Sequence, residues 1–423
     1  MSAQARPGLA RRPAVLTAIV AAIALIVIAA IFVPWDWVPG GRLSPMPTSK
    51  LLSPPEIAKI DNYNTVRRWL GWSAYFVSLA VALLLGFTSW GARLVRRIGG
   101  RFWWWIAVPL GALALLVIGR LVMLGFDLAL RAENLRYGLT NQSLAGWSAD
   151  YLKNLLVSWV ITSILLLVVV GFARRFPRSW FAWAGGTALV LTLAGSFLYP
   201  VVVEPLFNNF TPLKPGPFRQ SVFALAQREG VHISGVVVAD ASRRTTTVNA
   251  YVSGFGDTRH VVIYDNLLKD LTPAQARVVI AHELGHAKNR DVLLGTALGA
   301  IGAVVAVSVL ALLLDTTWLR WRAHVIGADD PAAVAVILAL VAAGGFLISP
   351  GENAVSRAIE ARADRASLHA THAGKTFIDM QRQLTIKSLT DPDPPGLSQF
   401  WWGTHPTPDQ RAGLPASLKA AGG

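Results

Sequence analysis

The sequence contains no cysteine, and only 15% of its 423 residues are charged. The lack of cysteine excludes disulfide bonds, thiol nucleophiles, cysteine-ligated zinc or iron–sulfur sites, and lipid attachment to cysteine. Charged residues make up roughly 25% of an average soluble domain, so the shortage of charge, with 53% hydrophobic residues, argues against both a soluble globule and a disordered chain. The net charge is +15, but the arginines flank apolar segments, where they anchor helices at lipid headgroups and do not indicate nucleic-acid binding.

Long apolar segments recur along the chain, each near the roughly 20 residues that span the hydrocarbon core of a bilayer. Many of the 16 tryptophans lie at the ends of these segments, where amphipathic rings prefer the membrane interface. The first segment is expected to be an uncleaved anchor, and the last to end at Pro350 and Gly351. The sequence therefore predicts a mainly α, multi-pass membrane protein whose seven spans cover residues 15–33, 69–90, 103–126, 155–172, 180–203, 292–314 and 332–348.

Two hydrophilic segments remain outside the membrane. We predict an N-terminal membrane region (1–204), a first hydrophilic segment (205–291), a transmembrane hairpin (292–349) and a second hydrophilic segment (350–423). The hairpin would bring the two hydrophilic segments together as one small α+β domain that caps the membrane part. Within it the patterns predict a helix over 217–229 and strands over 235–239, 249–253 and 260–264, the last two joined by a turn at 254–257.

The segment with the clearest chemistry is His282-Glu283-Leu284-Gly285-His286. It lies in a helix that is expected to begin at Thr272, a suitable N-cap, with Pro273 in the first helical position. Histidines four residues apart project from one face of a helix, so both imidazoles can reach one ion and the glutamate stands beside it. The alternative is an ordinary helix with two hydrogen-bonded core histidines.

A catalytic zinc ion needs a third protein ligand and an open position for water. Glu360 and Asp364 are four residues apart in a segment that follows the last span. Glu360 could bind the metal, and Asp364 could accept a hydrogen bond from a ligating imidazole, although such a pair taken alone is typical of a solvated helix face. His405, if it lies near the metal, could stabilise an oxyanion. The other histidines have no informative spacing and are interpreted as structural or exposed: His232, His260, His324, His369 and His372.

These motifs together resemble the type I CAAX prenyl endopeptidases, which are integral-membrane zinc proteases with seven spans. The resemblance extends from about residue 60 to residue 415 and includes several motifs in order besides the zinc pentapeptide. They are Glu133–Ser143, Pro205–Leu213, Asn249–Tyr251, Ser356–Asp364, and His405–Thr407 with Arg411.

The resemblance implies a helical barrel that encloses an intramembrane chamber, capped by the zinc domain. It implies one Zn²⁺ per chain, a glutamate as general base, a histidine that stabilises the transition state, and an edge strand on which an extended substrate pairs. The residues implied are His282, His286 and Glu360 as zinc ligands, Glu283 as base, His405 as stabilising histidine, Asp364 and Arg411 as supporting charges, and Asn249 and Ala250 on the edge strand.

We interpret the chain as a membrane-embedded zinc metalloendopeptidase that cleaves membrane-associated, lipidated or hydrophobic-tailed polypeptides. The alternative is a non-proteolytic membrane scaffold or transporter that retains a zinc site, for which Arg120 and Asp127 could belong to a translocation path or could equally line a protease chamber. The composition is rich in arginine, alanine and glycine, which is typical of a high-GC bacterial genome, so we expect the protein in a bacterial cell membrane. Prenylated proteins are not expected in such a membrane. Membrane proteins cleaved for quality control are therefore an equal alternative to prenylated substrates.

The side of the membrane that the zinc domain faces is left open by two arguments that disagree. Basic residues are concentrated in the short loops of one side, which the positive-inside rule assigns to the cytoplasm, so that the zinc domain would lie outside. The family resemblance implies a site that faces the cytoplasm. The basic loop residues are Arg6, Arg11 and Arg12; Arg93, Arg96, Arg97 and Arg101; Arg174, Arg175 and Arg178; and Arg320 and Arg322.

Overall fold

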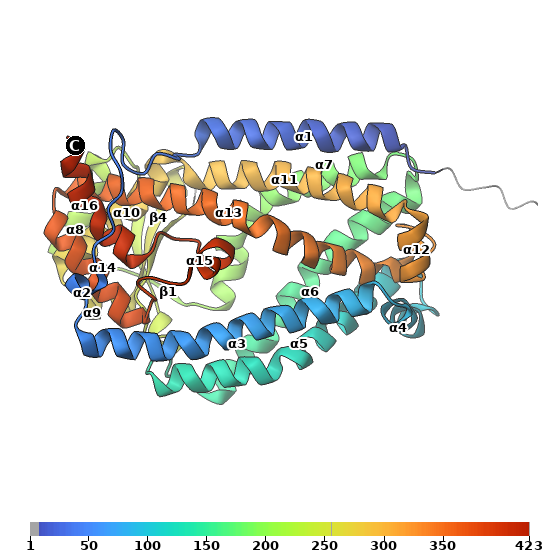
Figure 1. The fold of residues 1–423 in the computed structure, drawn as a ribbon, viewed down its shortest axis with the longest axis horizontal. Coiled ribbons are helices and arrows are strands. Elements are labelled where there is room, and N and C mark those ends of the chain that lie inside the picture. The colour runs from blue at the N-terminus through green and yellow to red at the C-terminus, as the bar shows by residue number, and fades with distance from the viewer. Residues whose placement is uncertain (1–7, 255, 423) are drawn as a thin grey trace, which may run out of the picture.

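A computed structural model describes residues 8–254 and 256–422; Arg6 and Phe255, which belong to predicted features, lie outside them. Long helices run side by side and carry a small mixed domain at one end (Figure 1). Seven helices of the described chain are long and apolar enough to cross a membrane, which confirms a mainly α, multi-pass membrane protein. They are α1 (Arg11–Phe32), α3 (Pro54–Gly86), α5 (Trp104–Arg136), α6 (Leu144–Arg175), α7 (Trp180–Leu198), α11 (Asp291–Leu314) and α13 (Val334–Thr371).

The membrane helices pack in neighbouring pairs, with α1 on α11, α11 on α7, α3 on α13, and α5 on α6. Helix α1 lies along the outside of α11 (Figure 1) and exposes large aliphatic side chains such as Ile26 and Ile31. Because a helix satisfies its own backbone hydrogen bonds, such an apolar surface is stable against lipid. Helix α7 continues through two short irregular turns, Tyr199–Val203 and Glu204–Leu206, into the mixed domain.

The helix of the last predicted span does not end at Pro350, because α13 continues through this proline to Thr371. A proline inside a helix leaves the carbonyl four residues earlier without its usual donor. That carbonyl belongs to Phe346, and it accepts hydrogen bonds from Trp401 Nε1 at 3.2 Å and Ser349 Oγ at 3.1 Å. Substitute donors therefore make the proline tolerable, and the membrane helix extends directly into the mixed domain.

The arginine-rich loops lie at the end of the molecule opposite the mixed domain. Helices α4 (Ser89–Gly99) and α12 (Thr317–Ala323) occupy this end (Figure 1). Arg96 pairs there with Asp330 at 2.9 Å. The second span was predicted to reach Trp90, but α3 ends at Gly86 and Trp90 belongs to α4.

The mixed domain contains one sheet in the order β1-β2-β4-β3, with β2 and β4 parallel and the outer pairs antiparallel. The strands are β1 (Phe210–Pro212), β2 (Gly235–Ala239), β3 (Ala250–Ser253) and β4 (His260–Tyr264). The last three lie close to the predicted ranges, and β1 was not predicted. The helices are α8 (Pro217–Arg228), α9 (Asp265–Asp270), α10 (Pro273–Asn289), α14 (Gly374–Ser388), α15 (Gly396–Trp402) and α16 (Pro408–Ala420). One buried core joins both hydrophilic segments: Leu225, Ile263 and Leu284 pack with Leu368 and Phe377.

A connecting segment between α1 and α3, residues 36–48, crosses the mixed domain, and we call it the strap. Ser44 N donates to Ser417 Oγ at 2.9 Å, and Met46 N donates to the Asp409 carbonyl at 2.9 Å. The Asp36 carbonyl accepts from Arg365 Nη1 at 2.9 Å. The strap therefore fixes α16 against the end of α13. Gly413 makes this close approach possible, since a methyl group there would overlap the Ser44 carbonyl oxygen and crowd Met46 N.

We expect Gly413→Ala to destabilise the mixed domain, because the added methyl group meets backbone atoms of the strap. Overpacking of this kind costs about 1–3 kcal/mol, which should appear as a lower midpoint of thermal unfolding in detergent. Gly295→Ala in α11 is the matched control, since a methyl group there meets no atom within 4 Å. Equal midpoints for Gly413→Ala and the control would show that the strap does not brace α16.

Candidate metal centre

Helix α10 presents the two histidines of the pentapeptide toward α13. Its start is fixed as predicted: Thr272 is the N-cap, its hydroxyl accepts from Gln275 N at 3.3 Å, and the Gln275 side chain completes a capping box. Ile280 and Leu284 are fully buried in the domain core. This burial fixes the rotation of the helix, so the face with His282 and His286 packs against α13.

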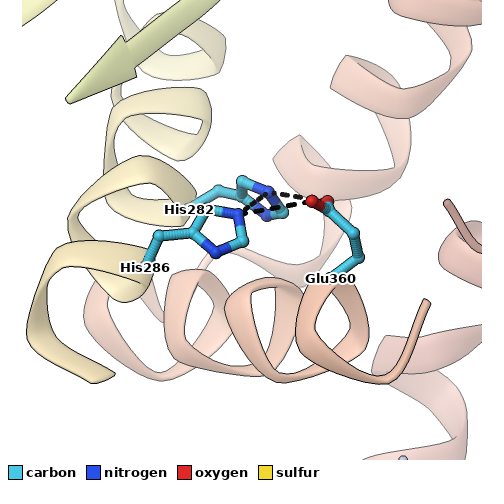
Figure 2. A group of neighbouring side chains, drawn as sticks. All are labelled: His282, His286 and Glu360. Carbon is cyan, nitrogen blue, oxygen red and sulfur yellow. Dashed lines mark hydrogen bonds and ion pairs between the residues drawn. The ribbon is translucent and has the colours of Figure 1, made fainter. Parts of the chain in front are cut away.

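The described residues bring three ligand atoms together, from His282, His286 and Glu360 (Figure 2). The Nε2 atoms of the two histidines are 3.1 Å apart. Glu360 Oε2 lies 3.2 Å from His282 Nε2, and Glu360 Oε1 lies 3.5 Å from His286 Nε2. Ligand atoms about 2 Å from a tetrahedral zinc ion are about 3.3 Å apart, so the spacing fits one small ion. Two imidazoles and one carboxylate are also the donor set of a catalytic zinc site with an open position.

Each of the two imidazoles that could bind the metal is supported from behind by an aspartate and an arginine. His282 Nδ1 lies 2.9 Å from Asp364 Oδ1, and Arg411 binds the same carboxylate through two hydrogen bonds of 2.8 and 2.6 Å. On the other side, His286 Nδ1 lies 2.9 Å from Asp291 Oδ2, and Arg362 pairs with Asp291. These contacts fix which ring nitrogen of each histidine faces the metal position.

Asp291 and Arg362 are the functional candidates that the sequence alone did not identify. Asp291 is the first residue of α11, beyond a left-handed turn at Arg290, so no helical spacing connects it with the pentapeptide. Two features of the sequence could have identified Asp291 as a partner of His286: it is only five residues further along the chain, and it lies at the start of an apolar span. By contrast, the predicted pairing of Asp364 with an imidazole corresponds to the observed contact.

The charges of the centre are strongly coupled. Burial lowers the pKa of His282, but hydrogen bonds with Asp364 and Glu360 outweigh this effect and raise that pKa to about 10. The carboxylates around His282 thus favour a positive charge at this position, which a metal ion would supply when bound. Burial raises the pKa of Glu283 above the usual value of a carboxyl. A general base needs a pKa moved toward neutrality in this way.

His405 reaches the same centre from a loop. Its Nε2 lies 3.5 Å from Glu360 Oε2, its Nδ1 lies 2.8 Å from Thr404 Oγ1, and its side chain is more than half exposed. The resemblance implied that Arg411 is its charged neighbour. Burial and the nearby positive charge of Arg411 both lower the pKa of His405. The Arg411 guanidinium itself is hydrogen-bonded to Asp364 and not to His405.

Helix α13 also holds the loop that carries His405. Arg357 Nη1 donates to the carbonyls of Gln399 at 3.0 Å and Gly403 at 2.6 Å. Asn353 Nδ2 donates to the Trp401 carbonyl at 2.6 Å, and Gln399 Nε2 donates to the His405 carbonyl at 2.7 Å. Residues 353, 357, 360 and 364 follow helical spacing, so one face of α13 positions α15, His405 and the metal ligands.

The predicted substrate strand is at an edge of the sheet. Ala250 begins β3, which is the last strand in the sheet order, and Asn249 directly precedes it. The Asn249 carbonyl accepts from Tyr264 N at 3.0 Å. Helix α10, with the histidines, packs against β3. An extended peptide can therefore be placed beside both the strand and the metal centre.

Comparisons with known proteins agree with this geometry. Residues 213–413 match the sequence profile of peptidase family M48, and residues 133–209 match that of the CAAX prenyl protease N-terminal region with five membrane helices. An uncharacterised metalloprotease of Bacillus subtilis, YhfN, is 27% identical over 85% of each chain. The CAAX prenyl protease 1 homologue of Dictyostelium discoideum is 32% identical over 48% of each chain. The chain spans 34% of the length of the Saccharomyces cerevisiae CAAX prenyl protease 1, with 28% identity.

The fold has a counterpart among solved structures. The crystal structure of Saccharomyces mikatae Ste24p superposes with a TM-score of 0.74 at 18% identity, covering 95% of this chain and 98% of that one. Fold and site together define a membrane-embedded metalloprotease. The part of the chain over residues 213–413 is similar to peptidase family M48, and the part over residues 133–209 to the CAAX prenyl protease N-terminal region.

We expect Asp291→Asn to weaken metal binding by about 10–100-fold, because His286 loses the carboxylate that orients its ring. The metal affinity is measured by competition with a chromogenic chelator. Asp265→Asn is the matched control, since Asp265 lies in the same domain and bonds Ser242, away from the histidines. If Asp291→Asn kept the affinity of the unmodified protein, the support of His286 by Asp291 would be refuted.

A second expectation concerns Arg357→Gln, which removes the donor that holds the loop before His405. The loss of an oxyanion donor in His405→Ala should lower the rate of proteolysis by about 10²–10³. Arg357→Gln should lower the rate as well, but by no more than that, and the metal content should stay constant. In a His405→Ala background the same change should cause little further loss. Arg382→Gln, which breaks a contact with Glu56 on α3, is the control. Additive losses in the double variant would contradict positioning through His405.

Proposed function

We propose that this protein is a zinc-dependent endopeptidase that cleaves membrane-associated or hydrophobic-tailed polypeptides at the His282–His286–Glu360 centre. The observation that carries the proposal is the close approach of His405 to the ligand Glu360, next to a pentapeptide that places Glu283 between the two histidines. A purely structural metal site requires neither an acid–base group nor an exposed histidine at its open side.

The residues support hydrolysis by an activated water molecule. A zinc ion, when bound, supplies a Lewis acid that polarises a carbonyl and lowers the pKa of water. Glu283 takes the proton of the attacking water and later delivers it to the leaving amine. His405 donates a hydrogen bond to the oxyanion that develops on the scissile carbonyl. Strand β3 holds the peptide extended, with Asn249 and Ala250 at the start of the pairing edge.

The substrate class is inferred from the position of the site. Helix α13 runs from the last apolar span to Glu360 without interruption, and Glu360 follows the end of that predicted span by only 12 residues. A polypeptide with a lipid or an apolar tail could then keep the tail in the bilayer while its peptide bond reaches the centre. Prenylated chains, as in the names of the eukaryotic relatives, are one such class, and membrane proteins cleaved for quality control are another.

The structure offers no support for a scaffold or transporter instead. The two intramembrane charges considered for a translocation path are engaged locally with Tyr151. Its hydroxyl donates to Asp127 at 3.1 Å, and the Arg120 guanidinium stacks 5.0 Å from the centre of its ring.

The test is cleavage by detergent-purified protein of two peptides that differ only in a prenylated C-terminal cysteine. Glu283→Gln at equal zinc content should lower the rate by about 10²–10⁴, the usual contribution of general acid–base catalysis, and a chelator should abolish cleavage. The ratio between the two peptides measures the contribution of the lipid. Cleavage by Glu283→Gln at the rate of the unmodified protein would overturn the assignment.

A further inference from the structure

The two faces of the sheet have different character. On one face, Val261 and Ile263 of β4 pack with Ala250 of β3 in the core beneath α8 and α10. Residues opposite each other in paired strands share a face. Tyr251 is opposite Val262 and lies on the other face, with His260 and Tyr264 of β4. These three polar and aromatic side chains are partly exposed.

A carboxylate lies at the end of the Tyr251 side chain. Tyr251 Oη donates to Glu204 Oε2 at 3.0 Å. Glu204 comes from the turn that follows α7 and is half-buried. The Tyr251 ring also makes an edge contact with Tyr264, with centroids 6.4 Å apart.

Among the described residues, no lysine or arginine forms an ion pair with Glu204. Its side chain accepts a hydrogen bond from Tyr251, and the basic side chain that acts on it electrostatically is His260. The arginines of the neighbouring loop are directed elsewhere: Arg243 and Arg244 both bond the Phe207 carbonyl, and they pair with Asp240 and Asp150. A half-buried carboxylate without a counterion is costly unless a ligand supplies one.

Strand β3 determines what can approach this carboxylate. A peptide added to its free edge places the side chain opposite Tyr251 on the same face as Tyr251. A lysine or arginine there extends about as far from the sheet as the tyrosine does. Its cation can contact the electron-rich ring and reach the carboxylate at the ring's tip. An acidic side chain at this position would be repelled.

We propose that Glu204 and Tyr251 form a substrate subsite that selects a lysine or arginine at the peptide position paired with Tyr251. The inference rests on the proposed function, because it requires a peptide on β3. Glu204 and Tyr251 are specificity-determining residues here, and neither takes part in the hydrolysis itself.

The test uses peptides in which lysine or its uncharged isostere norleucine is placed in turn at each position around the scissile bond. Lysine and norleucine peptides are compared at one pH, so that the cation of the peptide is the difference between the two reactions. The unmodified protein should prefer lysine at one position by about tenfold or more in kcat/KM, as for hydrogen bonds to charged groups. Glu204→Gln should remove this preference and leave norleucine peptides cleaved within about twofold.

A charge reversal and a control sharpen the test. Glu204→Lys should favour glutamate over glutamine at the same position. Glu229→Gln, which removes a carboxylate paired with Lys288 elsewhere in the domain, should keep the lysine preference. Glu283-dependent cleavage without a lysine preference, or with one that survives Glu204→Gln, overturns the subsite alone. If no peptide is cleaved in a Glu283-dependent manner, the proposed function fails and the subsite fails with it.

Discussion

The packing of α13 against α10 holds the whole centre together. At this contact Asp364, with 1% of its surface exposed, binds His282 on one side and Arg411 on the other. A buried carboxylate is tolerated only when its charge is paired and its oxygens are hydrogen-bonded. Three segments far apart in the chain must therefore meet here: helix α10, the continuation of the last span, and helix α16.

Helix α13 also joins the membrane part and the mixed domain into one structure. It does not end at Pro350, because Trp401 and Ser349 supply donors to the carbonyl that this proline leaves free. The same helix then presents Asn353, Arg357 and Glu360 along one face. One helix therefore contains the last apolar span and sets the position of Glu360 and of the loop that bears His405.

The two histidines of the centre are supported in the same way. The imidazoles of His282 and His286 are each held by an aspartate that is itself paired with an arginine. These contacts orient the two Nε2 atoms toward one point, which reduces the cost of assembling a metal site there. The side chain of His405 differs from these two imidazoles in being more than half exposed.

Much of the protein could be predicted from the sequence because the relevant signals are local. Apolar segments of bilayer length identify spans, and helical spacing puts His282 and His286 on one face and Glu360 with Asp364 on another. The N-cap Thr272 and the strand at residues 235–239 likewise depend on neighbouring residues, and both were located correctly.

Tertiary structure decided what depends on contacts between distant segments. The continuation of α13 through Pro350 required a tryptophan 51 residues further along the chain, which no local pattern contains. Asp291 became a partner of His286 only because the chain reverses at Arg290, and Glu204 met Tyr251 only because the end of α7 lies beside β3. The sequence by itself determined which residues could bind a metal and which segments could cross a membrane, since composition and spacing suffice for both. Which charges support His282 and His286, and which carboxylate lies beside the edge strand β3, were decided by packing, because a buried charge takes its partner from whatever the fold brings near.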